Sequence, residues 1–253
     1  MVRGFEYFGE YFKDYSDCFV VIGGTACVYY LDQIMPDVRV TDDIDMVLIL
    51  EAKNPDFNKI LLNFINEAEY KTIEKTDGTE QFYRFSNPKS EIYPKVIELF
   101  SRKPDMIDLT SLQYIVPVDL GDSLGYLSAI LLHDDYYNLI KDHCKVIENV
   151  PMIELEYIIP LKARAFVDNT RRKDEGQSIR KDDILKHRRD IYKLALMLDP
   201  ETKVLLPGII KQDISECVEL LRKEDFNVKS IKIFDYKKDD LINIITYIYD
   251  IKG

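Results

Sequence analysis

The sequence lacks several features that define large classes of proteins. Its four cysteines form no CxxC pair, and it has three histidines in 253 residues, so neither a zinc site nor a disulfide framework is indicated. No apolar run approaches the roughly 20 residues that cross a bilayer. The N-terminal segment carries acids and aromatics where a secretory signal needs a basic start and an apolar core. We therefore expect a cytoplasmic protein without a membrane span.

An excess of positive charge is also missing. The chain carries 34 Lys and Arg against 45 Asp and Glu, a net charge of −11, which argues against bulk attraction to nucleic acid or to an anionic membrane. Residues 162–193 depart from this pattern, with 11 basic and 6 acidic residues and a local net charge of 11 − 6 = +5. Two interpretations stay open: a basic strip that attracts polyanions, or a solvated helix pair with mixed charges.

Hydrophobic periodicity divides the chain into two parts. The first part mixes helical and strand patterns, with apolar strands ending near residues 22 and 50. The second part is mainly helical, over residues 155–169, 181–198, 211–223 and 239–251. We therefore expect an α+β fold: a domain of residues 1–120 with a mixed sheet, followed by a mainly helical domain of residues 121–253.

Acidic residues interrupt the strand pattern of residues 39–50, which read RVTDDIDMVLIL. On a strand, Asp43 and Asp45 point to one face, about 7 Å apart, and at an effective dielectric near 20 they repel by about 2 kcal/mol. A divalent cation reverses the sign of that interaction, because paired carboxylates are hard oxygen ligands that suit Mg²⁺. The alternative is that the acids cap a strand in solvent.

A glycine pair lies just upstream, between an apolar strand and a helix. Gly23-Gly24-Thr25 stands where backbone amides and a helix N-terminus can approach a phosphate, and the threonine hydroxyl can add a contact. Taken alone, this segment is better explained as a plain tight turn. Combined with the acid pair on the next element, it favours a nucleotide and metal site. In contrast, His133-Asp134-Asp135 has too few histidines around it for a metal phosphohydrolase.

Two motifs together carry a resemblance to a known family. VIGGTAC followed by RVTDDIDMVL resembles the DNA polymerase β-type nucleotidyltransferase superfamily, and the segments 83–102, 123–137 and 161–194 resemble the AbiEii-type enzymes of abortive infection and toxin–antitoxin systems. The chain departs from the superfamily pattern in two ways. The gap between Thr25 and Asp43 is 17 residues long, and the third carboxylate is Glu98 in place of an aspartate.

The resemblance implies a polymerase β-like fold for residues 1–120, with residues 121–253 completing the active-site cleft. It assigns Gly23, Gly24 and Thr25 to the triphosphate. Asp43, Asp45 and Glu98 would bind two Mg²⁺ ions, or Mn²⁺ in their place, and Glu98 would help to activate the acceptor. In the second domain Lys162 would contact the triphosphate, and Asp190 would complete the active site with Lys186 and His187 nearby. Because Lys186 and Asp190 are four residues apart on a predicted helix, Asp190 is expected to orient Lys186.

The implied activity is transfer of a nucleoside monophosphate from a nucleoside triphosphate to an acceptor hydroxyl. The acceptor would be an RNA 3′ end, a small molecule or a protein, and a toxin-like role with a cognate antitoxin protein would follow. Two alternatives stay open. One is a nucleotide-binding regulatory or partner module without turnover. The glutamate at position 98, where the superfamily has an aspartate, favours this alternative. The other is a structural interaction domain, in which Asp43 and Asp45 would point away from Gly23 and Lys162.

Overall fold

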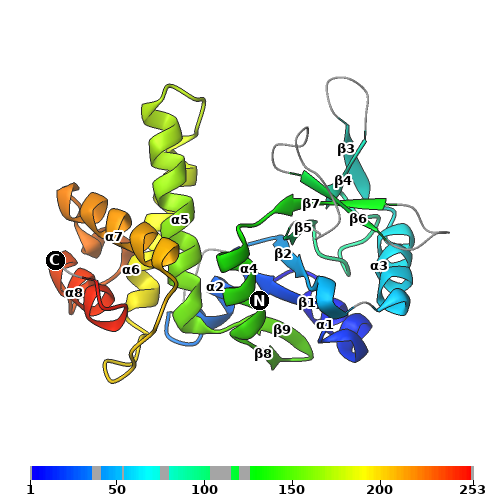
Figure 1. Ribbon diagram of the computed structural model, residues 1–253, viewed down its shortest axis with the longest axis horizontal. Coiled ribbons are helices and arrows are strands. Elements are labelled where there is room, and N and C mark those ends of the chain that lie inside the picture. Colours follow the sequence, from blue (N-terminus) through cyan, green and yellow to red (C-terminus); the bar gives the residue numbers. More distant parts are fainter. Residues whose placement is uncertain are drawn as a thin grey trace. The chain divides into compact units, whose positions relative to one another are not determined.

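A computed structural model describes residues 2–35, 41–52, 54–74, 80–102, 115–119 and 126–251. The chain divides into two compact units, Met1–Glu154 and Leu155–Gly253. In Figure 1 the first runs from blue to green and the second from yellow-green to red. The boundary differs from the one expected near residue 120, because residues 126–153 still add strands to the sheet of the first unit.

The first unit is built on a mixed sheet, which in the described residues has nine strands. Their bounds are β1 Phe19–Ile22, β2 Asp43–Leu48, β3 Lys71–Glu74, β4 Glu80–Ser86, β5 Val96–Ser101, β6 Ile115–Asp119, β7 Tyr126–Leu131, β8 Cys144–Ile147 and β9 Val150–Ile153. The main order is β3-β4-β5-β2-β1-β9-β8, and β7 pairs with both β5 and β6. Because β2 is antiparallel to β1 but parallel to β5, the expected mixed sheet is confirmed.

Helices α1 (Phe5–Phe12) and α3 (Pro55–Glu67) pack through an aromatic core. Asn54 begins α3, since its side chain accepts hydrogen bonds from the amides of residues 56 and 57. The ring of Phe12 lies 5.1 Å from that of Phe64 and 4.8 Å from that of Phe8, and all three side chains are fully buried. The rings of Phe8 and Phe12 also lie 5.7 and 5.8 Å from that of Phe19 in β1, so this aromatic cluster packs the two helices against the sheet.

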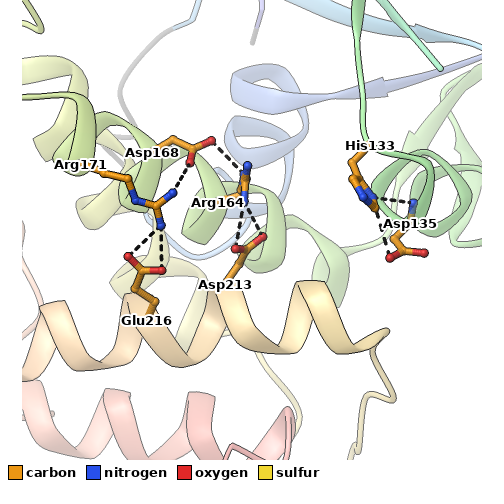
Figure 2. A network of polar contacts seen from close by, with 7 residues as sticks. All are labelled: His133, Asp135, Arg164, Asp168, Arg171, Asp213 and Glu216. Carbon is orange, nitrogen blue, oxygen red and sulfur yellow. Dashed lines mark hydrogen bonds and ion pairs between the residues drawn. The ribbon is translucent and has the colours of Figure 1, made fainter. Parts of the chain in front are cut away.

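Two further helices flank the strands of this unit. Helix α2 (Gly23–Leu31) follows β1 directly, and α4 (Asp134–Asp142) follows β7. The first turn of α4 is capped by His133, whose ring nitrogen accepts a hydrogen bond from the Asp135 amide at 3.2 Å (Figure 2). His133-Asp134-Asp135 is therefore the start of a helix.

The second unit is helical throughout its described regular elements. It contains α5 (Leu155–Asp174), α6 (Lys181–Ala195), α7 (Gly208–Lys223) and α8 (Lys238–Ile248), with a short 3₁₀ helix at Val228–Ile231. These are the four helices that the periodicity predicts. The C-terminal part is fastened to α5 by the buried Tyr249, whose hydroxyl donates to the Glu156 carbonyl at 2.5 Å. Over the described residues, no helix has the length and apolar character needed to cross a membrane.

Candidate functional site

The two acids of β2 occupy one face at the start of an otherwise buried strand. Asp43 and Asp45 are partly exposed, while Ile44, Met46 and the residues that follow them in β2 are buried. Pairing with β1 on one side and β5 on the other fixes the register, with Asp45 opposite Ile22 and Glu98. The carboxylates are therefore held on a rigid strand in the middle of the sheet.

The glycine turn contacts this acid pair directly. Gly23 has a φ of +71°, a conformation that disfavours a side chain, and a Cβ atom placed on it would lie 1.8 Å from Oδ2 of Asp45. A Cβ on Gly24 would lie 2.8 Å from the Thr41 hydroxyl oxygen. Asp45 therefore points toward Gly23, which contradicts the alternative in which this acid faces away from the turn.

The Thr25 hydroxyl, which was expected to contact a phosphate, contacts the protein backbone instead. The Thr25 side chain is buried, 1% exposed, and its hydroxyl donates to the Asp43 carbonyl oxygen at 2.6 Å. In this arrangement it ties α2 to β2 rather than presenting the hydroxyl to a ligand. No side chain caps the N-terminus of α2, and first-turn amides have no partner within their own helix. A phosphate at this turn would therefore have to be bound by backbone amides.

Glu98 lies in the same row as the acid pair but is engaged by an arginine. In the register of β5, Glu98 is opposite Asp45 on one side and opposite Arg84 of β4 on the other. The Arg84 guanidinium forms an ion pair with the Glu98 carboxylate. Sequence reasoning missed Arg84, because the pairing of β4 with β5 has no local signal. The carboxylate proposed as the third metal ligand is therefore already held in an ion pair.

The oxygen donors of this site fit Mg²⁺ bound together with a nucleotide. In the parts of the chain that the structure describes, no group of three or more His, Cys, Asp or Glu side chains is arranged to hold a metal ion. Mg²⁺ is commonly held by one or two carboxylates, with substrate phosphates and water supplying the other ligands. Asp43 and Asp45 meet that requirement, whereas the described residues contain no cluster of three or more such protein ligands.

The proposed site residues of the second unit pair with one another. The Lys162 ammonium, on α5, donates to the Asp190 carboxylate of α6 at 2.9 Å, and Lys162 is buried, 7% exposed. Lys186 pairs with Asp183 at 3.3 Å, so the expectation that Asp190 orients Lys186 is wrong. The reason is geometric: Lys186 reaches back along its own helix, while Asp190 faces α5. His187 is partly buried on the same helix.

The basic stretch of residues 162–193 is largely neutralised within its own unit. Arg164 bridges Asp168 at 2.9 Å and the buried Asp213 at 3.0 Å. Arg171 contacts both oxygens of Glu216 at 3.0 Å, so that α5 and α7 are joined by a chain of ion pairs (Figure 2).

Six of the 11 basic residues in this stretch form such pairs: Lys162, Arg164, Arg171, Arg180, Lys186 and Arg188. The contacts favour a mixed-charge helix pair over a strip that attracts polyanions.

Comparison with known proteins gives little information about the function of this site. No family model and no curated protein matches the chain. One solved structure that matches is the crystal structure of an antigenic nucleotidyltransferase-like protein from Paracoccidioides brasiliensis, at 13% sequence identity and a TM-score of 0.46. The match covers 97% of this chain and 94% of that chain. A likeness this distant assigns no chemistry, so the function is inferred from the contacts of the chain itself.

Proposed function

We propose that the chain is a Mg²⁺-dependent nucleotidyltransferase, which transfers a nucleoside monophosphate from a nucleoside triphosphate to an acceptor hydroxyl. The observation that carries this proposal is the contact of Gly23 with Asp45, where an added Cβ would overlap the carboxylate. It brings the N-terminus of a helix, which favours phosphate, against a pair of acids on one strand face, which favours a divalent cation. Both are needed to hold a metal–nucleotide complex.

The start of α2 and the acid pair of β2 have different roles in this proposal. The amides at the start of α2, beginning with Gly23 and Gly24, donate hydrogen bonds to phosphate oxygens, and the positive end of the helix dipole adds to this attraction. Asp43 and Asp45 hold the cation, which when bound supplies charge neutralisation for the phosphates and lowers the pKa of an acceptor hydroxyl. Because β2 is fixed between β1 and β5, the carboxylates need little reordering on binding.

The finer assignments are proposed on the sequence resemblance alone. They are the AbiEii-like, toxin-like role, a cognate antitoxin protein, the triphosphate contact of Lys162, and the placement of Lys186, His187 and Asp190 near the nucleotide. Among acceptors, the ion pairs of residues 162–193 lend RNA no added support, so a small-molecule or protein hydroxyl is an equal candidate. Both RNA and the protein itself therefore have to be tested as acceptors.

A second candidate function is a nucleotide-binding partner module without turnover. The ion pair between Arg84 and Glu98 favours it, because a carboxylate held by a guanidinium is a poor base for activating an acceptor hydroxyl. The two functions differ in one measurable respect. The module binds nucleotide without releasing pyrophosphate, and the enzyme releases one pyrophosphate for each transfer.

The test is transfer of label from α-³²P-labelled ATP, CTP, GTP and UTP, with Mg²⁺ or Mn²⁺, to total RNA or to the protein itself. Asp43→Asn combined with Asp45→Asn should abolish transfer and leave the fold intact. Asp42→Asn is the matched control, since Asp42 pairs with Lys95 at the surface at 2.8 Å and should be dispensable.

Full transfer by the Asp43 and Asp45 double variant would disprove the cation assignment. Nucleotide binding without transfer in the wild-type protein would support the module instead. Neither binding nor transfer with any of the four nucleotides would reject both functions.

A further inference from the structure

We infer that Arg84 holds the Glu98 carboxylate away from the cation site, so that Asp43 and Asp45 bind a single divalent cation when no nucleotide is present. Arg84 is thus a positioning residue that sets the number and affinity of cations. This inference rests on the cation site of the proposed function. It goes beyond that function because it assigns a role to a residue outside the glycine turn and the acid pair.

Cross-strand pairing places the relevant charges in one row. Asp45 on β2 is opposite Glu98 on β5, and Glu98 is opposite Arg84 on β4. Directly paired residues point to the same face of a sheet, with Cβ atoms about 5 Å apart. Two acids side by side in such a row repel, and Arg84 relieves that repulsion by its ion pair with Glu98.

The charges next to the acid pair suit one divalent ion. In the Asp45–Glu98–Arg84 row and the adjoining Asp43, the acids carry three negative charges and Arg84 one positive charge, a net of −3 + 1 = −2. One divalent cation neutralises these four groups. A second would then meet a neutral row and the nearby guanidinium, until a nucleotide supplies further negative charge. Without Arg84 the net charge is −3, and Glu98 becomes available as a third ligand.

Stabilisation of the fold alone does not account for the position of Arg84. The side chains of Arg84 and Glu98 are 35% and 18% exposed, and pairs that are partly open to solvent contribute modestly to stability. The first unit has another such pair, Arg102 with Glu51 at 3.0 Å. Arg102 follows β5, four residues beyond Glu98, so it provides a chemically matched control away from the acid pair.

The experiment measures Mn²⁺ binding by electron paramagnetic resonance, without nucleotide. Wild-type protein should bind one Mn²⁺ per chain in a manner that depends on Asp43 and Asp45. Arg84→Gln should bind Mn²⁺ at least about ten-fold more tightly, and adding Glu98→Gln should return the affinity to within about three-fold of wild type. Arg102→Gln should leave the affinity unchanged. Thermal melts check that each variant is folded.

Four results would overturn the inference: no Mn²⁺ bound by the wild type without nucleotide, two Mn²⁺ ions in the wild type that depend on the acid pair, an unchanged affinity in Arg84→Gln, or a gain that persists when Glu98 is also replaced. The first needs no variant, so the inference stays testable even if Arg84→Gln fails to fold. Failure of the proposed function looks different. In that case labelled nucleotide would neither bind nor be transferred, or transfer would survive Asp43→Asn with Asp45→Asn.

Discussion

Replacing Gly23 with alanine tests the contact on which the proposed site depends. The new methyl group would lie 1.8 Å from Oδ2, 2.7 Å from Cγ and 3.0 Å from Cβ of Asp45, so the carboxylate has to leave its position. The left-handed backbone, with φ +71°, costs about 1–2 kcal/mol for a residue with a side chain. Forcing Asp45 from its rotamer adds about 0.5–1.5 kcal/mol. We expect a loss of about 1.5–3.5 kcal/mol in the free energy of unfolding.

The assay is urea denaturation of the full chain, followed by Mn²⁺ binding to the folded variant. Gly208→Ala is the matched control, because a Cβ at Gly208, the first residue of α7, meets nothing within 4 Å. That change should stabilise the protein by up to about 1 kcal/mol. Gly23→Ala should also weaken Mn²⁺ binding, since Asp45 is displaced. A variant within about 0.5 kcal/mol of wild type that keeps its Mn²⁺ affinity would refute the proposed packing of the turn against Asp45.

Two further predictions concern stability. Asp190→Asn removes the carboxylate that the buried Lys162 ammonium contacts and should cost about 2–3 kcal/mol in denaturant unfolding; a loss below about 0.5 kcal/mol would contradict this. Burial opposes ionisation of Glu51, but hydrogen bonds from Tyr137 and Arg102 hold its pKa below the ordinary value. Its contribution is therefore present above about pH 4 and is lost as pH falls through the lowered pKa. In thermal melts recorded at a series of pH values, Glu51→Gln should lose less stability than the wild type as the pH falls below about 4. An equal loss of stability in the two proteins would refute the assignment.

Much of the acid pair and its turn could be predicted from consecutive residues. Strand alternation places Asp43 and Asp45 on one face, and the structure has them in β2 with that alternation. A helix after the Gly23-Gly24 pair is also expected, because a glycine pair between an apolar run and a helical pattern permits the backbone conformation of such a turn. In the structure the helix begins slightly earlier, at Gly23 itself. These features are local, so the sequence carries them directly.

Features that depend on distant pairing could not be predicted. The boundary near residue 120 was misplaced because β9 returns to pair with β1, with Val21 opposite Met152. That pairing joins segments far apart in the chain and leaves no periodic signal near either of them. Lys186 was assigned to Asp190 for a related reason: helical spacing allows the pair, but Asp190 contacts Lys162 on the neighbouring helix.

The sequence by itself determined the class of fold, the strand that carries the acids and the turn that precedes it, because these follow from alternation, apolar periodicity and glycine conformation. Only the tertiary structure decided that Gly23 packs against Asp45, that Thr25 donates to a carbonyl, and that Arg84 engages Glu98. Each of these contacts joins residues from different elements. Their partners are chosen by strand register and helix packing, which no single stretch of sequence encodes.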